Sequence, residues 1–253
     1  MQRPLFLILF LVLSGLSSNA QIVNIESLRS AADSNGLYGA ENFNVAYTKN
    51  TRELFELKNN LVAQYRHNRH IWLFLNTWDL SLAAGQTLEQ NVLFHLRYNF
   101  KQNDWLTYEV LAQYQQNQPL RISDRILMGA GPRYTLLKKK DVAKVYLGTL
   151  VMYEYDDELN NDIIHQDVRL SAYLSTYLTK KDKFEWSTTV YYQPRIDYWE
   201  DYRTSVQTQL KFGLLEKLFY VTTLSMTYDS FPVVAPEIPN LTLKWVNGIE
   251  LRF

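Results

Sequence analysis

Histidine is the residue type in this chain whose chemistry most readily supports acid–base catalysis or metal binding, and the chain contains four. His67 and His70 flank a tight turn at i and i+3, a spacing that could place both imidazoles on one metal ion. A zinc site needs at least a third protein ligand, and none is evident beside them. His165 has no serine at a spacing that indicates a nucleophile and base, and His95 falls among alternating polar residues. We therefore predict no enzyme activity, no metal and no cofactor.

Charged residues follow a more regular pattern, because they recur at every second position between apolar residues. Along 90–100 the polar set is Asn91, His95, Arg97 and Asn99, and the apolar set is Val92, Phe94, Leu96 and Tyr98. Alternation with period two indicates β-strands whose two faces meet different surroundings. The predicted inward faces carry the candidate functional residues Arg97, Glu109, Arg125, Arg133, Glu154, Asp167, Arg169, Glu185 and Arg203.

Two interpretations of these inward charges stay open. Small barrels fill their interiors with side chains, so the charges could pair across the lumen and close it. Basic residues outnumber acidic ones on the predicted inward faces, so the same residues could instead line a narrow pathway that favours a small anionic solute.

The alternation predicts an all-β fold, an antiparallel up-and-down transmembrane β-barrel of about 12 strands. The strands are placed at about 37–48, 53–66, 70–80, 90–100, 104–115, 121–136, 143–155, 165–178, 184–194, 202–212, 218–229 and 241–253. Tight, often lysine-rich turns alternate with longer connections, as the short periplasmic turns and longer outer loops of such barrels do. Tyr98, Tyr134 and Tyr177 each precede a tight turn, which predicts a periplasmic aromatic girdle.

The C-terminus resembles the assembly signal of bacterial outer-membrane barrels. Gly248, Leu251 and Phe253 have the spacing of that signal, and Phe253 ends the chain with an aromatic residue. An apolar face that alternates with charges is typical of a strand between lipid and a polar lumen. We therefore predict that the barrel-assembly machinery recognises this segment.

The N-terminus predicts export. An early Arg3, an apolar run and small residues before Gln21 are typical of a secretory signal peptide at 1–20. We place a short N-terminal periplasmic segment at 21–36 and the outer-membrane β-barrel at 37–253. With 26 basic and 26 acidic residues, the chain has no excess positive charge for binding nucleic acid, and with no cysteine it has no disulfide framework.

Four segments resemble one known family. They are RILMGAGPRY at 125–134, YYQP at 191–194, DYRTS at 201–205 and YDSFP at 228–232. In that order they resemble the domain of unknown function 481 family, the salt-induced outer-membrane protein type. The resemblance implies an outer-membrane barrel with no established activity, and it supplies no catalytic residues.

Three functions follow as hypotheses from these observations. The first is a barrel of the bacterial outer membrane, in contact with outer-membrane lipid, that acts as an envelope structural protein or a narrow passive channel with a basic-biased lumen. The second is a soluble exported β-barrel or sandwich that binds an apolar ligand, which would need an apolar interior. The third, an outer-membrane lipid hydrolase, would need a catalytic role for His95 or His165.

Overall fold

The computed structural model describes residue 26 and residues 34–49, 53–83, 86–139, 142–160, 162–180, 183–216, 218–232 and 239–251. The predicted signal peptide at 1–20, most of the predicted periplasmic segment at 21–36, and Phe253 lie outside the described residues. Of the predicted assembly signal, the described part is Gly248 and the backbone of Leu251.

Twelve strands form one sheet, which confirms the predicted all-β, antiparallel, up-and-down fold. The strands are β1 (Gly36–Lys49), β2 (Glu53–His67), β3 (His70–Ala83), β4 (Gln86–Lys101), β5 (Leu106–Asn117), β6 (Ile122–Lys139), β7 (Ala143–Glu158), β8 (Ile164–Lys180), β9 (Phe184–Pro194), β10 (Tyr202–Leu215), β11 (Leu218–Asp229) and β12 (Leu241–Leu251). A short 3-10 helix, η2 (Gln118–Leu120), connects β5 to β6.

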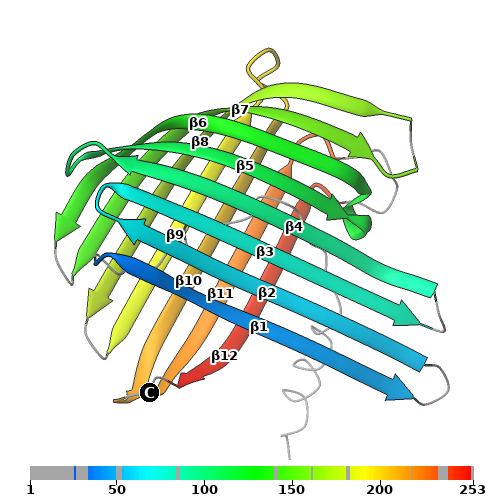
Figure 1. Cartoon of the computed structure of the whole chain (residues 1–253), viewed down its shortest axis with the longest axis horizontal. Helices are drawn as coiled ribbons and strands as arrows, with labels where there is room; N and C mark the ends of the chain where they lie inside the picture. Colours follow the sequence, from blue (N-terminus) through cyan, green and yellow to red (C-terminus); the bar gives the residue numbers. More distant parts are fainter. Residues whose placement is uncertain are drawn as a thin grey trace, which may run out of the picture.

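Each strand pairs with its neighbour in sequence, and the sheet curls into two facing walls, β1 to β5 on one side and β9 to β12 on the other (Figure 1). Among the described residues no ladder joins β1 to β12. The start of β1 and the end of β12 lie at one end of the sheet, which we call the terminus end. The opposite end, which we call the loop end, holds the connections after β5, β7, β9 and β11.

The two faces of the sheet are inverted relative to a soluble protein. On β5, Glu109 is 1% exposed while Val110 is 52% exposed, and on β8, Arg169 is 2% exposed while Val168 is 45% exposed. The concave face therefore buries charge, and the convex face exposes aliphatic side chains. Residues 70–80 are apolar at both odd and even positions, so alternation does not assign the two faces of β3. In the structure Leu73 is buried on the concave face.

Aromatic rings gather at both ends of the convex face. Near the terminus end, the rings of Trp72 and Tyr98 lie 4.5 Å apart, and Trp105 stacks on Tyr134. Near the loop end, the rings of Tyr192, Tyr202 and Tyr228 follow one another at 5.7 and 5.8 Å.

The predicted girdle position of Tyr177 is wrong. Its hydroxyl donates a hydrogen bond to the backbone carbonyl of Glu26, 2.6 Å away, on the concave face. The reason is that Tyr177 shares the parity of Arg169, so strand alternation places both side chains inside.

Among the described residues, no helix is long and apolar enough to cross a membrane.

Candidate functional site

Charged side chains on the concave face form two separate networks. The first, which we call the terminus-side network, consists of Arg97, Glu109, Arg133 and Glu26. Arg97 lies 3.3 Å from Glu109, and Arg133 lies 2.7 Å from Glu26. The crossed distances are 3.7 Å for Arg97–Glu26 and 3.5 Å for Arg133–Glu109. Two cations and two anions thus neutralise one another, and all four side chains are buried.

Glu26 is the member of this network that sequence reasoning missed. It precedes β1 in the chain, is 0% exposed, and places its carboxylate between the two arginines. A single residue outside the strands has no periodicity, so no sequence pattern could have indicated it. The carboxylate occupies the interior position at which a soluble anion would meet Arg97 and Arg133.

Tyrosines complete the terminus-side network. Tyr173 donates a hydrogen bond of 2.6 Å to Glu109, and the guanidinium of Arg133 lies 4.1 Å from the ring centre of Tyr146. Gly148 on β7 makes room for Tyr173, because a Cβ there would lie 2.1 Å from the tyrosine ring. Glycine is therefore needed at position 148 so that Tyr173 can pack in the terminus-side network.

Replacing Gly148 by alanine is expected to destabilise the folded protein by about 1–3 kcal/mol, the usual cost of overpacking. The added methyl group would force Tyr173 away from Glu109. Chemical denaturation measures the effect, and Gly248→Ala is the matched control because a Cβ there meets nothing within 4 Å. Equal stability of both variants would show that Tyr173 is free to move.

An apolar layer follows the terminus-side network toward the loop end. It contains the buried residues Leu111, Leu150, Met152 and Tyr191, with Leu127 packed against them. On β7, Leu150 and Met152 lie between Gly148 and the next charged residue, Glu154. These apolar side chains lie between the two charged networks, and they disfavour an unbroken column of water through the interior.

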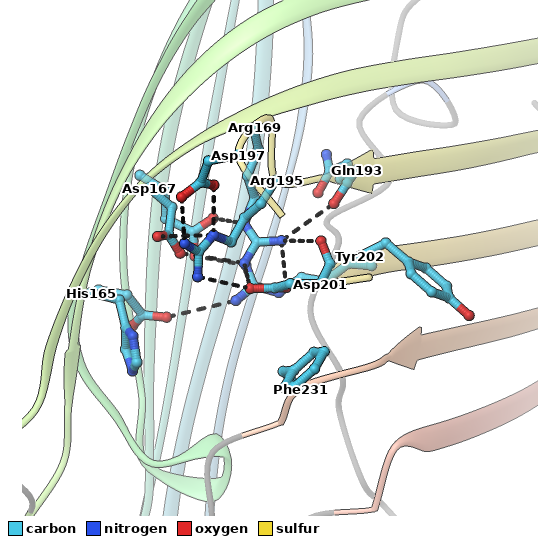
Figure 2. A network of polar contacts seen from close by, with 12 residues as sticks. His165, Asp167, Arg169, Gln193, Arg195, Asp197, Asp201, Tyr202 and Phe231 are labelled. Atoms are coloured by element: carbon cyan, nitrogen blue, oxygen red, sulfur yellow. Dashed lines mark hydrogen bonds and ion pairs between the residues drawn. The ribbon is translucent and has the colours of Figure 1, made fainter. Parts of the chain in front are cut away.

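The second network lies at the loop end and is shown from close by in Figure 2. Arg169 approaches Asp201 with two guanidinium nitrogens, at 2.9 and 3.1 Å, and Glu154 at 3.2 Å. Arg203 lies 2.7 Å from Glu154, and Arg125 pairs with Asp156. We call these six residues, together with Asp167, Arg195, Asp197 and Asp229, the loop-side network.

Arg195 joins the loop after β9 to this network. Its nitrogens lie 3.4 Å from Asp167, 3.4 Å from Asp201 and 2.8 Å from Asp197. The hydrogen bond from Arg195 holds the pKa of the Asp197 carboxyl below its ordinary range, and the same contact raises the pKa of Arg195. Loop and strands are therefore held by the same set of charges (Figure 2).

The structure places eight of the nine predicted lumen charges in these networks: Arg97, Glu109, Arg125, Arg133, Glu154, Asp167, Arg169 and Arg203. Glu185 lies apart from them, opposite Lys211 in the β9–β10 ladder.

Strand alternation alone did not single out Glu26, Asp156, Asp201 or Asp229. With these carboxylates included, the predicted basic bias does not hold for the loop-side network, where four arginines face six carboxylates.

His67 and His70 lie opposite one another in the β2–β3 ladder, and the other two histidines lie on other strands. His95 is buried with Nδ1 3.0 Å from Gln113, His70 contacts the Tyr98 hydroxyl, and His165 lies 2.9 Å from Glu158. The ring of His67 stacks on Tyr65. In the part of the chain that the structure describes, no group of three or more His, Asp and Glu side chains could hold a metal ion.

The fold and its inverted faces define an all-β protein of the up-and-down β-barrel class. The chain belongs to the family described as "Protein of unknown function, DUF481", whose family model matches residues 42–236. Two solved porin structures are similar to it. The NanC porin is 10% identical with a TM-score of 0.47, over 86% of this chain and 98% of that one. The KdgM porin is 11% identical with a TM-score of 0.42, over 85% and 99%. A comparison with curated proteins found no match.

Proposed function

We propose that this chain is an integral β-barrel of the bacterial outer membrane whose lumen is closed by paired charges. Its role is that of an envelope structural protein that conducts, at most, as a narrow passive channel. The observation that carries the proposal is the inversion of the two faces, with buried ion pairs inside and exposed aliphatic and aromatic side chains outside.

The convex face supports contact with lipid. Exposed apolar side chains occur on all twelve strands, and the strands are 11 to 18 residues long. A transmembrane strand needs about 9–11 residues, and soluble monomers rarely expose contiguous apolar surface on this scale. The aromatic rings at both ends match the girdles of outer-membrane barrels. A soluble barrel for an apolar ligand would need the opposite arrangement.

The orientation follows from the strand count. Because the number of strands is even, the start of β1 and the end of β12 lie at the same end of the sheet, the terminus end. We assign this end to the periplasm, because outer-membrane barrels have their short turns there. The loop end then faces outward. Export by a signal peptide at 1–20 belongs to the same proposal.

The interior supports a closed lumen. The two ion-pair networks and the apolar layer lie in series, leaving a cavity of about 160 Å³ at the terminus end and one of about 310 Å³ at the loop end. Buried charges are normally paired, and here pairing ties strands and loops that are not adjacent in sequence. We propose no catalytic role for these side chains.

Replacing Val151 by arginine separates the membrane proposal from a soluble protein. Val151 lies midway along β7 and is 53% exposed, so in water the change should be harmless. At the middle of a bilayer it should cost about 2–4 kcal/mol. Val142, in the turn before β7 and 44% exposed, is the matched control, because arginine near the interface costs roughly 0–1 kcal/mol. Folding into lipid vesicles measures both, and equal stability of the two variants would contradict the proposal.

Detergent dependence and conductance test the proposal as a whole. The mature protein should refold only in detergent or lipid, and in planar bilayers it should show small or no conductance. A monomer that is soluble without detergent would overturn the proposal, and a large, steady conductance would overturn the closed lumen.

Deleting Phe253 is expected to lower the yield of protein in the outer membrane. A terminal strand offers its edge for pairing, and an aromatic residue at its end anchors it at the lipid interface. Fractionation of cells that express the full chain and the truncated chain measures the difference, and Phe253→Tyr is the conservative control. Undiminished insertion of the truncated chain would remove the support for an assembly signal.

A further inference from the structure

The two edge strands of the sheet, β1 and β12, have no strand partner on their outer sides. In the core of a lipid bilayer no water is present to satisfy backbone N–H and C=O groups, so an open sheet edge is not tolerated there. Both edges therefore need a partner in the membrane, and the nearest one for each is the other edge. This step rests on the proposed function, because a protein in water is under no such constraint.

Electrostatic contact already links β12 to the wall that begins with β1. Lys244 on β12 is near enough to Asp79 on β3 to act on it electrostatically. Asp79 lies opposite Lys58 of β2, and Lys58 lies opposite Asn44 of β1. Because β12 lies near the β1 side of its own chain, closure within one chain is favoured over an exchange of strands between two copies.

Odd-numbered side chains of both edge strands belong to the convex face. On β12, Trp245 is exposed and Thr242 is buried. On β2, Tyr65 is exposed and Gln64 is buried, and the ladder places Leu37 of β1 opposite Tyr65. A strand partner must continue the same two faces, since a slip by one residue would exchange them. Odd positions of β1 must therefore pair with odd positions of β12.

The ends of the two strands then select one register. β1 ends at Lys49 and β12 begins at Leu241, both at the loop end. Pairing these two residues makes the strands flush and places Val45 opposite Trp245. In the same register Asn247 is the diagonal neighbour of Glu41 on the convex face, within reach of a long side chain.

Glu41 and Asn247 are polar residues on a face that is otherwise apolar along these strands. Counted from the terminus end, Glu41 is the sixth residue of β1 and Asn247 is the fifth of β12. Within the part of the chain that the structure describes, Glu41 makes no ion pair and no side-chain hydrogen bond. The Tyr220 hydroxyl donates a 2.7 Å hydrogen bond to Oδ1 of Asn247, which leaves the amide N–H groups of Asn247 for another acceptor. A carboxyl group in lipid is costly without such a donor.

We propose that β1 and β12 close the barrel in this register, and that the Asn247 amide donates a hydrogen bond to the Glu41 carboxyl group on the lipid-facing side. The contact satisfies two side chains that are each unfavourable in lipid, as polar residues do between membrane-spanning segments. It also distinguishes this register from others, which apolar side chains alone do poorly. The register of the closing ladder sets the tilt of the strands and the width of the lumen.

Disulfide formation tests the register, and the absence of cysteine from the chain makes the result specific. The mature chain carrying Val45→Cys/Trp245→Cys, refolded into phosphatidylcholine vesicles, should form an intramolecular disulfide on mild oxidation. Residues directly opposite one another have Cβ atoms about 4.5–5.5 Å apart, which overlaps or lies close to the range for a disulfide. The control Val45→Cys/Leu241→Cys moves the second thiol four residues along β12 and should stay reduced.

Three outcomes of the oxidation would overturn the closure. A disulfide-linked dimer would mean that a second copy occupies the edge, equal reaction of both cysteine pairs would mean that no register is fixed, and no reaction in the first pair would mean that the edges do not meet as proposed. If Val151→Arg is destabilising in vesicles as expected while the disulfide is absent, the chain spans the membrane and only the closure is wrong. If both results fail, the membrane proposal fails as well.

Unfolding of Glu41→Leu, Asn247→Leu and the double variant in the same vesicles tests the hydrogen bond. Removing either partner leaves the other unsatisfied in lipid, so the double variant should be more stable than the two single effects predict. We expect this coupling to be about a factor of ten in the unfolding equilibrium. Asn247→Leu combined with Asn76→Leu is the control, because Asn76 lies on β3, beyond β1 and β2, and these two effects should add. If the effects of Glu41→Leu and Asn247→Leu also add, lipid covers each side chain separately and the proposed contact does not exist.

Discussion

Replacing Arg169 by methionine will destabilise the folded protein by about 3–5 kcal/mol, the cost of leaving buried charges without their partner. Arg169 is 2% exposed and holds Asp201 through two nitrogens and Glu154 through a third. Both carboxylates are themselves buried, so water cannot take over the lost contacts. Urea-induced unfolding from lipid vesicles or detergent micelles, followed by tryptophan fluorescence, measures the loss.

The same experiment decides between a closed and a hydrated lumen. In a wide, water-filled lumen, the contribution of Arg169 would fall to roughly 0–1 kcal/mol, the range of exposed ion pairs. Asp197→Asn is the internal control, because that carboxylate belongs to the same network but is 69% exposed, so its loss should cost no more than the roughly 0–1 kcal/mol of an exposed ion pair. If Arg169→Met costs no more than Asp197→Asn, the loop-side network does not close the barrel.

Arg169→Lys tests whether the stability of the folded protein depends on the geometry of the guanidinium group or only on its positive charge. Lysine keeps the positive charge but has no planar fork, so it cannot reach Asp201 and Glu154 at the same time. Its stability should lie between those of the arginine and methionine forms. Full stability of the lysine form would mean that the network needs only a local positive charge.

The strands could be predicted from the sequence because lipid and a polar interior impose opposite preferences on successive residues. Along β4 and β8 the alternation is almost strict, and it placed Arg97 and Arg169 on the concave face where the structure has them. The same reasoning could not assign the faces of β3, because both of them carry apolar residues. Leu73 packs against apolar neighbours on the concave face, while Trp72 is exposed on the convex face. Only the neighbouring strands resolve such a case.

Charge partners from irregular segments could not be predicted in the same way. Asp201 lies in the connection before β10 and Glu26 precedes β1, so period-two reasoning did not reach them. Alternation also cannot show a register shift such as the one in β6 between Thr135 and Leu137, which changes the face of the strand residues that follow it. The interior therefore looked basic from the sequence, whereas both networks contain at least as many carboxylates as arginines.

Replacing Glu26 by alanine will make the barrel more conductive and more selective for anions. Without this carboxylate, Arg97 and Arg133 share the single charge of Glu109, so the terminus-side network carries a net positive charge. Fixed positive charge at a constriction favours anions. The folded protein should also lose about 3 kcal/mol, at the lower end of the cost of breaking a buried pair, because Arg133 keeps Glu109 and the Tyr146 ring.

Two further variants at the same position separate charge from volume. Glu26→Gln keeps the side chain's size, so it should shift the ion selectivity towards anions with a smaller rise in conductance than Glu26→Ala. Glu26→Asp keeps the charge and should retain the selectivity of the unmodified chain. Reversal potentials in planar bilayers under a salt gradient report selectivity, and single-channel currents report conductance. If the alanine and glutamine forms match the unmodified chain in both measurements, the carboxylate of Glu26 does not lie on the ion path, and any conduction must bypass the terminus-side network.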